Sequence, residues 1–206
     1  TDAFKAAQNC NNNVAIGQAA LSDVVSTNWN VAVGSFAGLK LTGTGNTALG
    51  YSALKGATGS TGSYNIGIGL EAGENISSGG HNICIGSYAG EEITTAYSNV
   101  CIGRNTGDDI TTGGSNTLVG AYAGGALTTG ANNVALGNSA LGTATTGFGN
   151  VAIGESAMEV STGYNTVAVC RYALKRHTSS IMNTAVGVSS LEYTTTGEKT
   201  TAVGYN

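Results

Sequence analysis

The chain has 206 residues, of which 33 are Gly and none is Pro, while charged residues make up 10% and the net charge is −4. A hydrophobic share of 41% with so little net charge excludes a chain that is disordered by charge repulsion. Collagen is excluded because Pro and a Gly at every third position are missing. No apolar run approaches a membrane span, so we expect no membrane insertion. Eight Lys and Arg against twelve Asp and Glu argue against a nucleic-acid partner.

A pentad of the form Asn-Val-Ala-Ile-Gly recurs twelve times along the chain. The pentads end at positions 17, 34, 50, 69, 86, 103, 120, 137, 154, 170, 187 and 204, so the usual step from one pentad to the next is 17. Self-similarity at a fixed period is typical of solenoids, in which each repeat buries its apolar side against the next repeat. The sequence therefore predicts an all-β fold, a β-solenoid (β-roll or β-helix) of about twelve 17-residue coils.

The repeats also define the domain organisation. We expect a single solenoid over 13–206, preceded by a lead-in or partial coil at 1–12. One step, from 50 to 69, is longer than the others, and the Gly and Ser residues there predict a loop insertion near 59–63. Each coil has room for two short strands about 10 Å apart across the interior, and coils would stack at about 4.8 Å. Such ladders need nearly every backbone N–H, which explains the absence of Pro.

Each pentad column has a physical interpretation. The fourth residue is aliphatic in every copy, for example Ile16 and Val33, so we expect it to face the core. The second residue, which is Val, Ile or Thr, shares that side of the strand, and the mostly small third residue lies between them. Gly closes eleven of the twelve pentads, which indicates a tight bend at that point.

The first pentad residue is Asn in ten of the twelve copies. An amide side chain at a turn can bond its own backbone and its copies above and below. We therefore interpret this column as structural rather than ligand-binding. Its members are Asn13, Asn30, Asn46, Asn65, Asn82, Asn99, Asn116, Asn133, Asn150 and Asn183.

Catalytic chemistry has little support in the sequence. Enzymes need titratable groups that converge on one site, and the two His residues, His81 and His177, lie on different repeats. We interpret both as solvated turn residues. The stretch Gly67-Ile68-Gly69 does not complete a dinucleotide-binding fingerprint. We therefore expect neither an enzyme nor a cofactor.

Two acidic pairs leave two interpretations open. Glu91 and Glu92 lie one full repeat before Asp108 and Asp109, so the four carboxylates either attract a divalent cation such as Ca²⁺ or form a solvated acidic surface. Otherwise the sequence indicates no metal site.

Cys84 and Cys101 occupy one column on consecutive coils. Strands in register would place their Cα atoms about 4.8 Å apart, within disulfide range. The two thiols therefore either form a disulfide or stay free.

Thr recurs near the period in the polar turn before the next Asn, and Ser179 fills one gap in the column. A stacked Thr column forms either a hydroxyl ladder that stabilises the turns or a surface that orders water as ice-binding proteins do. Because only one Thr of each adjacent pair can face outward, the column is a poor match for an ice lattice. Its members are Thr95, Thr112, Thr129, Thr146, Thr162 and Thr196.

Stretches such as NVALGNSALGTATTGFGNVAIGESAM (133–158) and NTAVGVSSLEYTTTGEKTTAVGYN (183–206) resemble the tandem repeats of phage and viral tail-fibre proteins. In that family such repeats commonly precede a C-terminal intramolecular chaperone. The stretches are also similar to the head repeats of trimeric autotransporter adhesins, whose coils build a β-roll with a shorter period. The resemblance implies an extracellular or virion fibre, often a trimer.

These observations favour a structural protein of an extracellular or virion fibre, used for display, spacing or adhesion. Its partners would be copies of itself, in a homotrimer or a head-to-tail filament. The step from Gly204 into a second copy as far as Gly17 lies within the spacing range of the repeats, so stacked ends would continue the solenoid. The alternative is a ligand-binding solenoid that takes ice or a glycan through the Thr column, with a cell-surface glycan or receptor as its partner.

Overall fold

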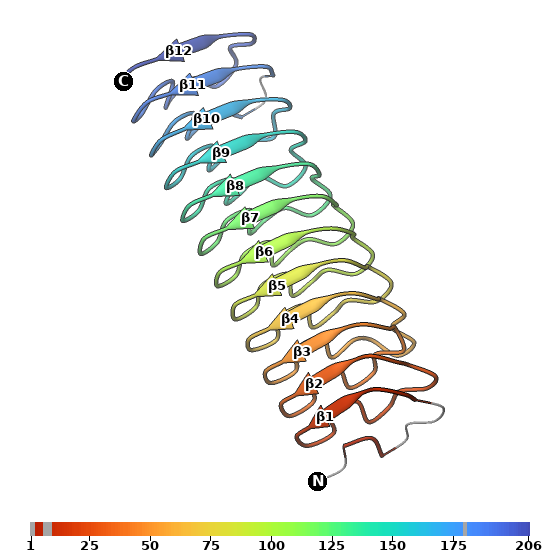
Figure 1. Ribbon diagram of the computed structural model, residues 1–206. Coiled ribbons are helices and arrows are strands. Elements are labelled where there is room, and N and C mark those ends of the chain that lie inside the picture. The colour runs from red at the N-terminus through yellow and green to blue at the C-terminus, as the bar shows by residue number, and fades with distance from the viewer. Residues whose placement is uncertain (1–2, 6–9, 179–180) are drawn as a thin grey trace.

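A computed structural model describes residues 3–5, 10–178 and 181–206, and in it the chain climbs as a parallel β-solenoid (Figure 1). Each coil contributes one three-residue strand, and the twelve strands form one parallel sheet in chain order. The strands are β1 (Val14–Ile16), β2 (Val31–Val33), β3 (Thr47–Leu49), β4 (Ile66–Ile68), β5 (Ile83–Ile85), β6 (Val100–Ile102), β7 (Thr117–Val119), β8 (Val134–Leu136), β9 (Val151–Ile153), β10 (Val167–Val169), β11 (Thr184–Val186) and β12 (Thr201–Val203). The predicted solenoid is therefore confirmed.

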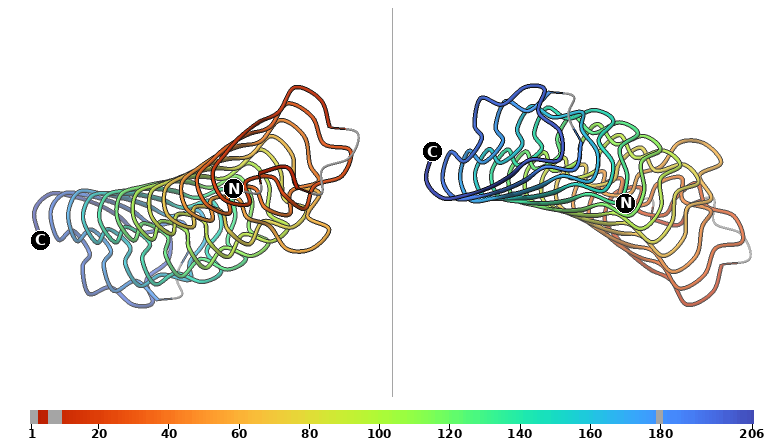
Figure 2. Two further views of the ribbon diagram at one scale, coloured as in Figure 1. Left: turned by 90° about the horizontal axis from the view of Figure 1, so that it is seen from below. Right: turned by 90° about the horizontal axis from the view of Figure 1, so that it is seen from above.

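Neighbouring strands pair in register, so each pentad residue lies beside its own copy on the next coil. The views from below and above show one coil outline repeated along the rod, with a gradual rotation from coil to coil (Figure 2). The described residues contain no helix. In this part of the chain there is accordingly none long and apolar enough to cross a membrane.

The two predicted irregularities of the solenoid can be located. The Phe4 N–H donates to the Ala20 carbonyl at 3.1 Å, and Asn11 bridges to Asn28, so residues 3–5 and 10–12 lie against the first coil. The rest of the lead-in, 1–2 and 6–9, lies outside the described residues. In the long coil, residues 57–59 are exposed, and Ser60 already pairs with Leu41. The extra length thus lies mostly just before the predicted 59–63.

The predicted second strand of each coil is not formed. Outside the sheet the described residues make only isolated bridges, for example between Phe148 and Tyr164. The reason is that the rest of each coil bends repeatedly through left-handed residues, such as Tyr88 and Ser98, both at φ +60°. Backbone hydrogen bonds still join successive coils here, as from the Ser98 N–H to the Gly80 carbonyl at 3.1 Å.

The prediction of which strand residues face the core was wrong. The middle residue of each strand faces inward, and Ala32, Cys84 and Leu118 are almost completely buried. The aliphatic second and fourth pentad residues point outward instead, and Ile16 is 60% exposed. The interior is too thin to hold large side chains from every column. The third pentad residue, which is mostly small, therefore occupies it.

Side chains of complementary size fill the interior. Six residues after the buried strand residue, a coil carries either Gly or a large apolar side chain, and in most coils the size is reversed three residues later. Two coils depart from this pattern, because Leu21 and Val24 are both large and buried, as are Leu174 and His177. Gly90, for example, lies between Cys84 and Ile93, and a Cβ added to it would meet the Cys84 Sγ at 2.7 Å. In another coil Leu141 is large and Ala144 is small, and both are fully buried. This exchange keeps the core filled while the coil outline stays constant.

Candidate functional site

The outward side chains of the sheet form one continuous surface, which we call the strand face. It consists of the first and last residue of every strand from β1 to β12, which makes 24 side chains. Twenty of them are Val, Ile or Leu, and the remaining four are Thr47, Thr117, Thr184 and Thr201. No charged residue lies in any of the twelve pentads. The strand face is therefore uncharged along its whole length.

The side chains of the strand face range from partly exposed to well exposed in the single chain. Leu49 is 46% exposed and Ile153 is 36% exposed. With coils about 4.8 Å apart and three residues per strand, the face is about 53 Å long and about 10 Å wide. Its projected area of about 500 Å² is of the size at which apolar patches mark interaction surfaces.

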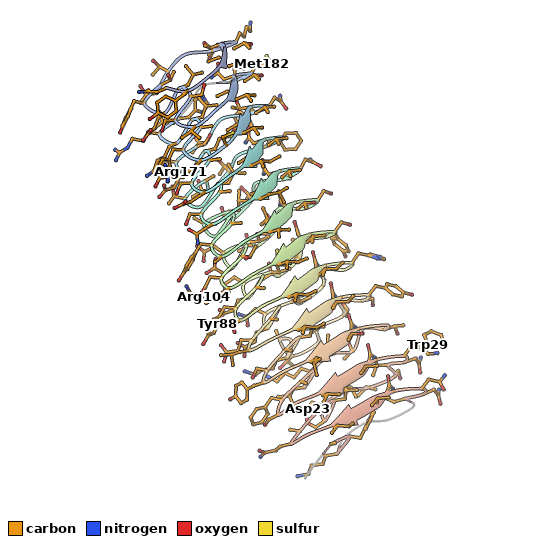
Figure 3. All side chains as sticks on the ribbon, turned by 60° about the vertical axis from the view of Figure 1, so that its left-hand side comes forward. Asp23, Trp29, Tyr88, Arg104, Arg171 and Met182 are labelled. Atoms are coloured by element: carbon orange, nitrogen blue, oxygen red, sulfur yellow. The ribbon has the colours of Figure 1, made fainter. Side chains whose placement is uncertain are left out.

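Charged side chains lie on other parts of the coil. Figure 3 shows Arg104 and Arg171 on one edge of the rod, together with Tyr88, while Trp29 and Met182 project from the opposite edge. The guanidinium groups on the first edge lie over aromatic rings, as Arg104 does over Tyr122 at 4.7 Å. Glu198 and Lys199, which directly precede the last pentad, belong to the edge of Trp29 and Met182. Both edges thus carry charges, and the strand face between them carries none.

Among the described residues, one group of three carboxylates comes together, formed by Glu71, Glu74 and Glu91, whose nearest oxygens lie within 4.8 Å of one another. Of the four residues predicted as a cation site, only Glu91 belongs to this group. Lys55 already forms an ion pair with Glu74 at 2.7 Å, and this hydrogen bond raises the pKa of Lys55. Partial burial, followed by repulsion from Glu71 and other carboxylates, raises the pKa of Glu91.

The other predicted cation ligands have protein partners or face solvent. Asn75 donates to Glu92 at 3.1 Å, and Asn105 donates to Asp108 at 3.2 Å. Burial raises the pKa of Asp108, although the hydrogen bond from Asn105 acts in the opposite direction. Asp109 is exposed. The cation site stays a prediction.

The predicted Thr column faces solvent. Its members Thr95, Thr112, Thr129, Thr146, Thr162 and Thr196 are all exposed, while Ser179 lies outside the described residues. The hydroxyl ladder between coils comes mainly from the preceding Thr of each pair. Thr94 donates to the Thr111 carbonyl at 3.0 Å, and Thr111 to the Thr128 carbonyl at 3.1 Å. Thr162 belongs to this ladder as well, through the Thr178 carbonyl.

The Asn column forms a buried ladder of side-chain amides. Asn133 donates both its backbone N–H and its Nδ2 to the Oδ1 of Asn116, each at 3.0 Å. The same Nδ2 donates to the Gly147 carbonyl at 2.8 Å, which closes the turn within the coil. Asn30, Asn46, Asn65, Asn82, Asn99, Asn116, Asn133, Asn150 and Asn183 are buried, and Asn13 on the first coil is partly buried.

Cys84 and Cys101 pair directly between β5 and β6. Both thiols are free and fully buried. A hydrogen bond with Cys84, followed by burial, holds the pKa of Cys101 well above its ordinary value. Such a thiol is unreactive, because the thiolate is the reacting species.

The two His residues differ in environment. His81 is exposed as predicted, and its ring stacks on Tyr64 at 5.1 Å. The prediction for His177 was wrong, because its side chain is fully buried. Its Nε2 lies 2.8 Å from the Nδ2 of Asn183, and its Nδ1 lies 3.3 Å from the Ser161 hydroxyl. This burial lowers the pKa of His177.

Comparisons with known proteins add no relative. No protein-family model matches the chain, and neither a curated protein nor a solved structure matches it. The interpretation of function therefore rests on the surfaces of the solenoid itself.

Proposed function

We propose that the chain is a structural rod, part of an extracellular or virion fibre, which assembles side by side with further copies of itself. The observation that carries this proposal is the strand face, which runs over all twelve strands without a charge. An apolar surface of this length is unfavourable in water and is stabilised by covering it. A second copy fits it because every column meets an equally uncharged column.

The shape of the strand face favours three copies over two. The strand face is only about 10 Å wide, so two chains placed face to face would contact each other along this narrow strip alone. In a ring of three, each chain contacts two neighbours and also buries the turn residues that flank the strands. A closed parallel homotrimer keeps the rungs of all chains at the same height.

A mechanical role agrees with the hydrogen bonding of the rod. Backbone ladders join each coil to the next along the axis, as from the Val100 N–H to the Asn116 carbonyl at 2.8 Å. The Asn and Thr side-chain ladders also join successive coils along the axis. Separating two coils requires many hydrogen bonds to break together, which suits a spacer exposed to force and proteases. The resemblance of the repeats to tail-fibre and adhesin repeats supports the same role.

The mass of the purified chain in solution tests this proposal. We expect sedimentation equilibrium to give the mass of three chains. Ile102→Glu places a carboxylate in the middle of the strand face and should shift the mass to that of one chain, since an unpaired charge in an apolar interface is strongly unfavourable. Thr112→Glu is the matched control, because Thr112 is exposed away from the strand face on the same coil.

Circular dichroism checks that both variants stay folded. A wild-type chain that remains single at 100 µM contradicts side-by-side assembly. An open series of larger masses, with filaments in electron micrographs, would instead favour end-to-end stacking of the rods. An equal loss of mass in both variants would show that the strand face is not the interface.

A further inference from the structure

A hollow of about 230 Å³ lies on the turn edge of the rod, between the long coil and the coils that follow it. Tyr64 and His81 come directly before pentad residues Asn65 and Asn82, as Trp29 does before Asn30, so the hollow lies on the edge where Trp29 projects in Figure 3. The side chains that line the hollow and carry the argument are Thr61, Ser63, Tyr64, Ser78, His81 and Tyr97.

Two exposed aromatic platforms border the hollow. Tyr64 is 56% exposed, and its ring is nearly parallel to that of His81, with an interplanar angle of 21°. Tyr97 is 52% exposed, and its hydroxyl donates to the Ser78 carbonyl at 2.9 Å. Solvent-exposed aromatic rings of this size can pack against an apolar surface of a ligand.

Glycine residues let these rings lie against the backbone. A Cβ at Gly45 would meet the Tyr64 Cδ1 at 2.7 Å, and a Cβ at Gly80 would meet the Tyr97 Cε1 at 3.2 Å. The backbone below Tyr64, the stacked His81 and the Tyr97 hydroxyl bond therefore fix both platforms in advance. Fixed platforms lose little conformational entropy when a ligand binds. Other coils have a small polar residue at the position of Tyr64, such as Ser115, so the turn itself does not require a ring there.

We infer that this hollow is a binding subsite for one ring of a neutral carbohydrate. The C–H face of a pyranose is apolar and packs on an aromatic ring, while its hydroxyls can bond Thr61, Ser63 and Ser78. No carboxylate, Lys or Arg lines the hollow, so it offers no ion pair to a phosphate, sulfate or carboxylate ligand. Its volume of about 230 Å³ limits the ligand inside the hollow to a small group such as a single sugar ring.

The subsite goes beyond the proposed structural role and can fail independently of it. The test uses the full chain and a panel of methyl glycosides of glucose, galactose, mannose and N-acetylglucosamine at millimolar concentration. We expect saturation-transfer NMR to detect at least one of them. Tyr64→Ala and Tyr97→Ala should each weaken that binding at least tenfold. Tyr164→Ala is the matched control, because Tyr164 is an exposed aromatic on the same edge outside the hollow, and it should leave binding within twofold.

A second readout needs no variant. On titration with the bound glycoside, the ring proton signal of His81 should move, while that of the buried His177 should stay in place. Absence of binding by every glycoside overturns the inference, as does an equal loss in the Tyr164→Ala control. Binding of a proline-rich peptide at His81 without any glycoside would assign the hollow to a different class of ligand and also overturn it. Sedimentation of the Tyr variants should still give the wild-type mass, since they leave the strand face intact.

Discussion

The Nδ2 of Asn116 donates to the Oδ1 of Asn99 on the coil below at 3.0 Å. The backbone N–H of Asn116 donates to the same oxygen at 3.0 Å, so one carbonyl oxygen satisfies two buried donors of the next coil. Repeated from coil to coil, this relationship makes each Asn both the donor to one neighbour and the acceptor for the other. The turn before each strand is thus held by side chains.

Replacing one Asn should open the ladder on both sides. Asn116→Ala leaves the N–H and Nδ2 of Asn133 without their acceptor and the Gly130 carbonyl without its donor. Each buried polar group left unpaired costs about 1–3 kcal/mol. We expect Asn116→Ala to lower the free energy of unfolding by about 3 kcal/mol in urea denaturation. Asn138→Ala, at an exposed position, serves as the control and should change it by less than about 0.5 kcal/mol.

The Gly that closes each pentad should tolerate no side chain. Gly103 has φ +135°, and an added Cβ would lie 2.7 Å from the carbonyl carbon of Gly120. We expect Gly103→Ala to destabilise the rod by about 3 kcal/mol, because backbone strain and a backbone contact add together. A variant of wild-type stability would show that the coils can separate locally without loss.

The one non-Gly residue of that column gives the converse prediction. Cys170 adopts φ +99°, which is unfavourable for any residue with a Cβ. Cys170→Gly should therefore raise the free energy of unfolding by about 1 kcal/mol. Cys170→Ala keeps the Cβ and should gain nothing, so a gain in both variants would point to the thiol rather than to the backbone.

The sequence predicted the fold correctly but not which face of the strands is buried. The repeat predicted the solenoid because its period is visible in every coil. Alternation within a strand separates two faces but does not say which one is inside, and the larger aliphatic residues were assigned to the core. A signal for the correct face was present: wherever the middle residue is larger than Ala, as at Cys84, Cys101 and Leu118, Gly follows six residues later. Side-chain sizes compensate each other in this way only where the residues pack in the same interior. The pattern therefore indicated that the middle residue faces the core.

The hollow at Tyr64 and Tyr97 was harder to foresee. Neither residue belongs to a repeated column, and they are 33 positions apart in the sequence. Their proximity depends on the left-handed residue Tyr64, at φ +59°, and on Gly residues that let the rings lie on the backbone. Backbone turns of this kind leave no periodic pattern in the side chains, unlike the strands.

Glu91 should make the rod less stable at neutral pH than it is in mild acid. Burial and the neighbouring carboxylates raise its pKa above the ordinary 4.5. The favourable contribution of the protonated group is therefore present below about pH 4.5 and is lost as the pH rises through the folded-state pKa. We expect Glu91→Gln to raise the melting temperature at pH 7 and to leave it nearly unchanged at pH 4. The gain should shrink in 1 M salt, and the exposed Glu155→Gln should show no comparable gain.

His177 should give the rod the opposite pH dependence, so that its contribution to stability is lost in acid rather than at neutral pH. Asn183 Nδ2 also donates to the Gly197 carbonyl at 2.6 Å, which orients that amide nitrogen as a donor to the unprotonated Nε2 of His177. A proton on Nε2 would face this donor, and the buried ring holds a lowered pKa. Because the unfolded chain binds the proton more readily, stability is fully present above pH 6.5 and falls as the pH drops through the folded-state pKa, by at most about 1.4 kcal/mol per pH unit.

Urea denaturation at pH 7.5 and pH 5.5 measures this effect of His177. His177→Gln keeps an acceptor for Asn183 but does not titrate, so the difference between the two pH values should shrink. His81→Gln, at the exposed ring, should preserve the difference. If His177→Gln leaves the pH dependence unchanged, the acid sensitivity of the rod arises elsewhere, and the buried ring serves only to fill the core between Ser161 and Asn183.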